Sequence, residues 1–270
     1  MPALASKDKV GRVEISNLVK RYGDKNVVDN LSLTMFQNEI LVLLGHNGAG
    51  KTTTLNILTG LTKASQGRAM ASNLQAQPID LFTDYQHIVD LIGLCPQIDV
   101  LFTEMTVREN LVFYCRLKGV ERMDAVIEET LQKFNLASKA NNFAKEISGG
   151  QKRKLQLAIA LLGNAKIVLL DEPTSGMDPT ARRETWEIIK ESKRDRIIIL
   201  TTHYMDEAEY LADRVAVVSK GALKVCGTTS FLKQSFGQYF YIEVEPLEKD
   251  AGQKNEALME LLEASNSLHK

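Results

Sequence analysis

The stretch of sequence that decides the fold reads Gly45-His46-Asn47-Gly48-Ala49-Gly50-Lys51-Thr52. It matches in full the pattern G-x-x-x-x-G-K-[ST], in which backbone N–H groups close around a phosphate, the lysine reaches phosphate oxygens and the hydroxyl ligates Mg²⁺. The apolar residues 40–44 precede it and the helix-like residues 53–59 follow it. The alternative is a glycine-rich turn without a ligand, but the four fixed positions arise by chance in such a chain only on the order of once in a hundred. We therefore predict that this stretch, the cradle, binds a nucleoside triphosphate.

The composition is that of an ordinary globular protein. With 270 residues, 44% of them hydrophobic, the chain can bury the core of one large domain or of a domain with an inserted subdomain. Its net charge of -1 gives no broad basic surface, so we expect no nucleic-acid partner. Three widely spaced cysteines indicate neither disulfides nor a zinc site. No stretch approaches the roughly 18 apolar residues of a membrane span, so we expect another chain or segment to do any spanning.

Hydrophobic patterns predict an α/β core. Four runs are apolar on both faces and read as buried, parallel strands: residues 40–44, 167–170, 197–200 and 215–218. Residues 11–18 and 31–35 alternate polar and apolar, as in a half-exposed antiparallel sheet. Residues 101–165 show helices and no convincing strand, with a capping box at Thr106 and Glu109 that opens a helix toward residue 117. Near the end of the chain we expect a strand at residues 239–244 and a short helix at 257–263.

Several polar residues follow predicted strands, at the edge where a parallel sheet binds ligands. Asp171 and Glu172 end one strand, where we assign Asp171 to Mg²⁺, through water, and Glu172 to the general base. The alternative, two acids that begin a solvated loop, is disfavoured by the cradle upstream. His203 follows the next strand and can meet a γ-phosphate, although a lone histidine is more often a surface or core residue. Gln97 follows Pro96 in a loop and by itself indicates only polarity.

A second anion site is predicted far from the cradle in sequence. In Ile147-Ser148-Gly149-Gly150-Gln151 the serine can cap a helix whose first N–H groups lie free. One γ-phosphate does not need two such sites on one subunit. A head-to-tail dimer is the physical solution, in which these residues close over the nucleotide that the partner's cradle holds.

This ordered set of motifs resembles the nucleotide-binding domain of an ABC transporter over residues 13–227. The cradle corresponds to the Walker A motif, residues 147–151 to the signature and residues 167–172 to Walker B. By the same resemblance, Tyr22 stacks on adenine, Gln97 is the Q-loop glutamine, Asp178 belongs to the D-loop and His203 is the switch histidine. Residues 44–54, 93–97, 113–119 and 202–208 are similar to the A subfamily in particular, whose members often handle lipids. The departures, Ile147 and Met177, conserve bulk.

The resemblance implies a P-loop NTPase core, mainly parallel with an antiparallel β subdomain, and an inserted helical subdomain of the ABC ATPase type. We expect the cradle part of the core at residues 11–97, helices ending in the signature and its helix at 98–165, the rest of the core at 166–236 and a C-terminal extension at 237–270.

It also implies ATP and Mg²⁺ as ligands, with roles as follows. Tyr22 holds adenine, and Gly48, Gly50, Lys51, Thr52 and Thr53 hold the phosphates. Thr52, Gln97 and Asp171 hold Mg²⁺, and Glu172, His203, Gln97 and Lys51 act in catalysis. Ser148 and Gly150 act across the dimer, and the other residues expected to bind the nucleotide are Asn47, Ala49, Gln151 and Asp178.

The expected partners are membrane-spanning domains of the same transporter and a second nucleotide-binding domain, in the same polypeptide or an identical copy. The domain would then lie at the cytoplasmic face of a membrane, with residues 98–108 as a candidate docking surface and a lipid or other amphipathic molecule as cargo. One rival is a soluble ABC-type ATPase that acts in DNA maintenance or translation, but the chain has no heptad run and only one cradle. A second rival is a non-hydrolysing regulatory module, against which Glu172 and His203 argue.

Overall fold

The computed structural model describes residues 10–74, 77–84, 88 and 91–236. The strand and helix expected at 239–244 and 257–263 lie outside the described residues. Two compact units divide the chain, residues 1–232 and 233–270, and the helix α8 (Thr229–Phe236) runs across the division.

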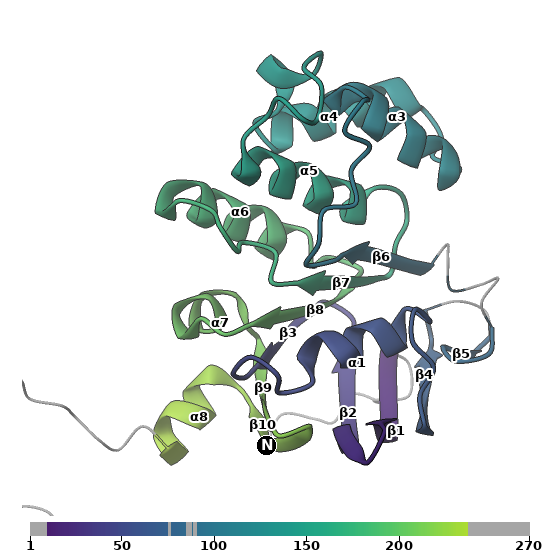
Figure 1. Ribbon diagram of the computed structural model, residues 1–270, viewed down its shortest axis with the longest axis vertical. Coiled ribbons are helices and arrows are strands. Elements are labelled where there is room, and N and C mark those ends of the chain that lie inside the picture. Colours follow the sequence, from purple (N-terminus) through teal and green to yellow (C-terminus); the bar gives the residue numbers. More distant parts are fainter. Residues whose placement is uncertain (1–9, 75–76, 85–87, 89–90, 237–270) are drawn as a thin grey trace, which may run out of the picture. The chain divides into compact units, whose positions relative to one another are not determined.

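A six-stranded sheet forms the core, in the order β10-β9-β3-β8-β7-β6 (Figure 1). Its strands are β6 (Ile92–Cys95), β3 (Glu39–Leu44), β7 (Ile167–Asp171), β8 (Ile197–Thr202), β9 (Arg214–Ser219) and β10 (Ala222–Gly227). All neighbouring pairs are parallel except β9 with β10. The four strands predicted from the apolar runs are therefore confirmed as the middle of the sheet, and β6 and β10 are additions to the prediction.

The antiparallel sheet predicted before the cradle is confirmed and has four strands, in the order β2-β1-β4-β5. They are β1 (Arg12–Tyr22), β2 (Lys25–Phe36), β4 (Gln66–Ser72) and β5 (Ile79–Asp80). Helix α1 (Lys51–Leu58) crosses this sheet in Figure 1, and its apolar side chains share one core cluster with both sheets. Leu41 and Leu43 of β3 point into that cluster, whereas Ile40, Val42 and Leu44 point into the other. Burial on both faces explains why β3 is apolar from Ile40 to Leu44.

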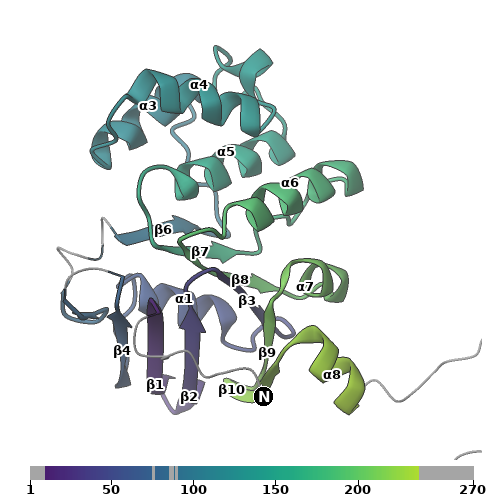
Figure 2. The ribbon, with the colours of Figure 1, turned by 180° about the vertical axis from the view of Figure 1, so that it is seen from behind.

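Helices cover the second face. They are α3 (Val107–Leu117), α4 (Met123–Lys133), α5 (Gly149–Leu161), α6 (Pro179–Glu191) and α7 (Met205–Leu211), with a 3₁₀ turn, η2 (Ala137–Lys139). The capping box is confirmed, because the Thr106 hydroxyl accepts from the Glu109 N–H at 3.1 Å and Glu109 accepts from the Thr106 N–H at 2.7 Å. Residues 101–165, all described, contain helices and no strand, as expected. Figures 1 and 2 place α3, α4 and α5 together beyond β6 and β7.

None of the helices in the described part of the chain combines the length and the apolar character that crossing a membrane requires.

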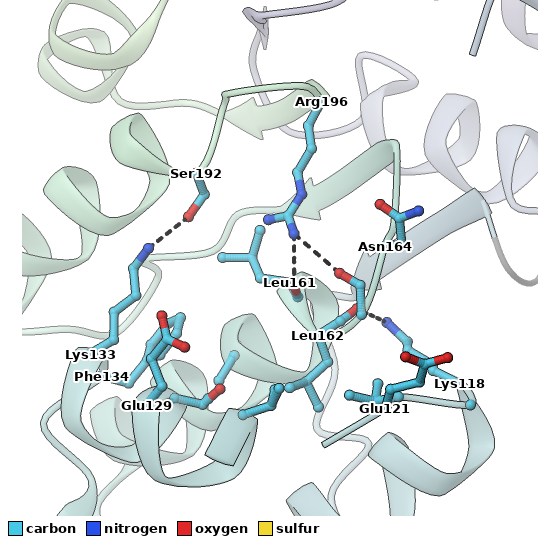
Figure 3. A pocket seen from close by; sticks show the side chains of 16 residues that line it. Lys118, Glu121, Glu129, Lys133, Phe134, Leu161, Leu162, Asn164, Ser192 and Arg196 are labelled. Carbon is cyan, nitrogen blue, oxygen red and sulfur yellow. Dashed lines mark hydrogen bonds between the residues drawn. The ribbon is translucent and has the colours of Figure 1, made fainter. Parts of the chain in front are cut away.

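Two cations lie at the C-terminal end of α5, beside a pocket of about 670 Å³ (Figure 3). The Lys118 ammonium donates to the carbonyls of Ile159 and Leu162, at 3.0 and 3.3 Å. The Arg196 guanidinium donates to the carbonyls of Leu161 and Gly163, at 3.2 and 3.3 Å. The last carbonyls of a helix have no partners within the helix and carry partial negative charge, so both cations stabilise this end of α5.

Burial lowers the pKa of Lys118 to about 8, and the neighbouring charge of Arg196 adds to the shift. Because this value lies below that of an unfolded lysine, folding penalises the charged form at pH 8 and below. The penalty disappears as the pH rises from about 8 toward 10.5. We measure the free energy of unfolding in urea at pH 7 and at pH 9.5. Between these pH values we expect it to rise by on the order of 1 kcal/mol more for wild type than for Lys118→Met. The exposed Lys224→Met is the control, and a difference that is flat with pH would contradict the assignment.

Candidate nucleotide site

The cradle joins the end of β3 to the start of α1. Gly50 is the N-cap of α1, with a φ of 98°, and no side chain caps the helix. The first N–H groups of α1 are therefore free of intrahelical and capping partners, which is the arrangement that binds phosphate. A Cβ on Gly50 would lie 2.5 Å from the Val27 carbonyl of β2, so glycine is required by space as well as by conformation.

Lys51 lies folded over this loop. Its ammonium donates to the carbonyls of Gly45 and His46, at 2.6 and 3.1 Å, and no carboxylate of the described residues forms an ion pair with it. Burial lowers the pKa of Lys51, and the nearby charges of Glu172 and Asp171 oppose that shift. The cation is thus held at the cradle within the field of both Walker B acids, and its two hydrogen bonds there go to neutral carbonyls that a phosphate oxygen could replace.

Three predicted residues meet around the Glu172 carboxylate, although each follows a different strand. Oε1 of Glu172 lies 3.1 Å from Nδ1 of His203, and Nε2 of Gln97 donates to Oε2 at 3.5 Å. The Glu172 side chain is 11% exposed and the His203 ring 33% exposed. A carboxylate in this position can accept a proton from a bound water, and the amide and the imidazole can orient what lies between them.

The predicted metal ligands lie at the same edge of the sheet. Asp171 is 3% exposed, and its Oδ1 accepts from the Thr201 hydroxyl. Thr52 and Thr53 are half-buried in the first turn of α1. The described residues contain no group of three His, Cys, Asp or Glu side chains able to hold a metal ion together. A single carboxylate, a hydroxyl and an amide do fit Mg²⁺, which keeps several waters and takes its other ligands from substrate phosphates.

Among the described residues, neither Tyr22 nor Asp178 forms a hydrogen bond with Gln97, Glu172 or His203. Tyr22 ends β1 with 53% exposure, and the Lys20 ammonium lies 4.7 Å from the centre of its ring. Its hairpin partner β2 carries Val27, whose carbonyl faces Gly50 of the cradle. Asp178 caps α6 by accepting from the N–H groups of Thr180 and Ala181, both at 3.0 Å. Those bonds, the one from Ala181 foremost, lower the pKa of Asp178.

The signature residues form the predicted helix cap. The Ser148 hydroxyl accepts from the Gln151 N–H at 3.2 Å, and Oε1 of Gln151 accepts from the Ser148 N–H at 3.0 Å. A Cβ on Gly149 would meet nothing within 4 Å, and one on Gly150 would only touch Met177 at that distance. In Figures 1 and 2, α5 lies across β6 and β7 from α1, so the chain does not bring its own signature to its own cradle.

Sequence reasoning missed Arg153, one turn into α5. Arg153 is 6% exposed, and its guanidinium donates to the backbone carbonyls of Gln97 and Glu172. Thr201 was also missed, although it holds the Asp171 carboxylate and the Glu172 N–H. No periodic signal marks Arg153, because three basic residues follow one another at 152–154 and only the fold determines that Arg153 is the one that reaches the backbone of Gln97 and Glu172.

Comparison with known proteins identifies the family of the chain. The family model for ABC transporters matches residues 28–175. Phospholipid-transporting ATPase ABCA3 of Homo sapiens is 44% identical over 87% of the chain, which spans 14% of that relative. Retinal-specific phospholipid-transporting ATPase ABCA4 of Homo sapiens is 43% identical over 84% of the chain, which spans 10% of it. The chain thus corresponds to a seventh or less of the length of these relatives, both of the A subfamily expected from the sequence.

Two solved structures share the fold. The ATP-binding subunit of an ABC transporter superimposes with a TM-score of 0.75 at 26% identity, over 83% of this chain and 93% of that one. A dimeric ATP-binding cassette with ADP and Pi, in a post-hydrolysis state, superimposes with a TM-score of 0.70 at 24% identity, over 80% and 98% of the two chains. The predicted fold class is confirmed by these matches and by the two sheets and helices described above. The chain therefore belongs to the ABC transporter family, as one of its ATPase domains.

Proposed function

We propose that this domain binds ATP with Mg²⁺, hydrolyses it and thereby powers transport by an associated membrane-spanning region. The observation that carries the proposal is the meeting of Gln97, Glu172 and His203 at the sheet edge, beside a cradle whose Lys51 is coupled to the same acids. A non-hydrolysing binding module would need the cradle alone.

The residues divide the work of phosphoryl transfer by position. The N–H groups of the cradle and the Lys51 ammonium hold the phosphates, and Tyr22 holds adenine. Glu172 takes the proton of the attacking water, while His203 positions the γ-phosphate. When bound, Mg²⁺ neutralises charge on the phosphates, and Thr52, Gln97 and, through water, Asp171 are the residues that hold it.

We infer a head-to-tail dimer because the exposed N-terminus of α5 is a second anion site with nothing to bind in its own subunit. Ser148, Gly150 and Gln151 would close over the partner's nucleotide, with Asp178 beside them. The fold neighbour that holds ADP and Pi is itself dimeric. The second domain is either an identical copy or another part of a longer polypeptide.

The membrane partner is inferred from the family and from exposed apolar side chains. Ile98 is 72% exposed and Phe102 42% exposed, within the proposed docking surface at residues 98–108. Because relatives are named as phospholipid-transporting ATPases, we propose a lipid or similar amphipathic cargo and a place at the cytoplasmic face of a membrane. We keep the proposed division into residues 11–97, 98–165, 166–236 and 237–270, since the helices that begin after Gln97 are the part that would move with the membrane partner.

The direct test is phosphate release from ATP by the 270-residue chain, with Mg²⁺ and with EDTA. We expect turnover on the order of 1 s⁻¹ with Mg²⁺, at least about a hundredfold loss in EDTA, and full recovery when Mg²⁺ is added back. Binding of ATP without phosphate release in Mg²⁺ would instead establish the non-hydrolysing module. Turnover that is indifferent to EDTA would rule out the proposed metal ligands.

A further inference from the structure

Arg153 joins three parts of the site through its guanidinium. Nη1 donates to the carbonyl of Pro96 and, at 3.4 Å, to that of Gln97. Nη2 donates to the carbonyl of Asp171 and, at 2.9 Å, to that of Glu172. One side chain of the signature helix α5 therefore bonds both to the loop of Gln97 and to the end of β7.

Burial of the Arg153 cation lowers the stability of the fold, so a purely structural role does not explain it. Arg153 is 6% exposed, forms no ion pair among the described residues, and its Nε has no hydrogen-bond partner. Its Nη1 also reaches the neutral Gln156 amide, at 2.8 Å. A buried cation that is compensated only by dipoles costs stability, and apolar side chains of similar volume often replace buried charges without loss. A role in positioning explains why a charge with a planar fork of donors lies here.

The Glu172 backbone is what the fork holds. Glu172 has a φ of 48°, in the left-handed region that residues other than glycine rarely adopt. Its N–H donates to Thr201, to the hydroxyl at 3.1 Å and to the carbonyl oxygen at 3.2 Å. Its carbonyl oxygen accepts from the Arg153 guanidinium at 2.9 Å and from the Ser175 N–H at 3.1 Å, and of these two donors only Arg153 comes from another element. With both ends fixed, the side chain is directed to His203 and Gln97. Such a conformation persists only where the surroundings enforce it.

We propose that Arg153 is a positioning residue for Glu172, which adopts its catalytic orientation only while α5 is seated against the sheet. The proposal rests on the proposed function, in which Glu172 is the base and the N-terminus of α5 closes over the partner's nucleotide. One helix then serves both sites of a dimer: Ser148 at its start binds across the interface, and Arg153 holds the base of its own subunit.

Substitution of Arg153 distinguishes a role in positioning Glu172 from a role in stabilising the fold. We expect Arg153→Met to lower turnover by about 10- to 100-fold while the Kd for ATP changes by no more than about twofold, because a small misplacement of a catalytic group costs that much rate. Arg153→Lys keeps the charge but not the planar fork of donors, so we expect its turnover to lie between those of wild type and Arg153→Met. Lys154→Met is the matched control on the same helix, because Lys154 is 8% exposed, pairs with Glu184 at 2.8 Å and forms no hydrogen bond with Gln97 or Glu172 among the described residues. Thermal unfolding of all three variants measures their stability. A loss of turnover that simply parallels a loss of folded protein would overturn the proposal.

A mixture of Lys51→Ala and Ser148→Arg chains makes the test specific. In the head-to-tail heterodimer the one intact site uses Glu172 of the Ser148→Arg chain and the α5 N-terminus of the Lys51→Ala chain. Arg153→Met added to the Ser148→Arg chain is expected to lower turnover at least about tenfold, and added to the Lys51→Ala chain to change it by less than about twofold. Arg153→Lys is tested in the same two places in case the methionine variant folds poorly.

Equal losses in both placements, or a loss only on the Lys51→Ala chain, would overturn positioning of Glu172 by Arg153. Absence of turnover in the parent mixture, without any change at Arg153, would instead refute the dimer, so the two failures are distinguishable.

Discussion

Glu172→Gln is expected to lower ATP turnover by about 10²- to 10⁴-fold, the range that general-base catalysis contributes. The amide has nearly the same shape as the carboxylate but cannot accept the proton of the attacking water. Its backbone, held between Thr201 and Arg153, need not move. We therefore expect the Kd for ATP to stay within a factor of about two, because the cradle and Lys51 carry the binding. Phosphate release and equilibrium binding of a fluorescent ATP analogue measure the two effects separately.

The control for Glu172 is Glu128→Gln, which removes an exposed carboxylate of α4 that pairs with Arg108. It should leave turnover unchanged, because exposed pairs contribute little and Glu128 lies outside the site. Since hydrolysis is what releases the dimer in the proposed cycle, the Glu172→Gln chain should also accumulate as a dimer when ATP is added, by analytical ultracentrifugation. Undiminished phosphate release by Glu172→Gln would mean that another group is the base.

Lys51→Ala is expected to lower turnover by at least about a hundredfold, as the loss of one charged group at a transition state does. It should also weaken ATP binding by about tenfold or more, because charge-assisted hydrogen bonds to phosphate are lost. The same ammonium binds the carbonyls of Gly45 and His46, so a lower melting temperature is expected as well. Lys51→Arg is the informative companion, since it keeps the charge but presents a larger, planar group to a cradle of fixed size. Full turnover by Lys51→Ala would remove the cradle from the catalytic site.

Much of the fold was predictable because its signals are local. The apolar runs of β3, β7, β8 and β9 identify strands that are buried on both faces. Thr106 and Ser148 mark the starts of helices, because each caps the helix that follows it with its own hydroxyl. The strand β6 was missed because it has four residues and includes Gly93. That glycine is explained only by packing, since a Cβ there would lie 2.0 Å from the Ala160 carbonyl of α5.

The chemistry of the site was predictable in kind but not in geometry. Gln97 and His203 carry almost no signal alone, and the resemblance to the family is what singled them out. Their convergence on Glu172 depends on which strands are neighbours, which no local pattern specifies. The left-handed backbone of Glu172 and the inward turn of Arg153 are likewise imposed by contacts between residues far apart in sequence. Tertiary contacts therefore determine the orientation of groups that sequence identifies only by type.

The central claim, that this cradle is half of a site completed by the signature of a second domain, is tested most directly by mixing two inactive variants. Lys51→Ala chains lack a working cradle and Ser148→Arg chains lack a working signature, so neither homodimer has an intact site. Their heterodimer has one, and a random equal mixture should recover about a quarter of wild-type turnover. Recovery of that size, from two variants that are each inactive alone, is the predicted result. A mixture no more active than its components, while wild type turns over and both variants remain folded, would contradict the claim.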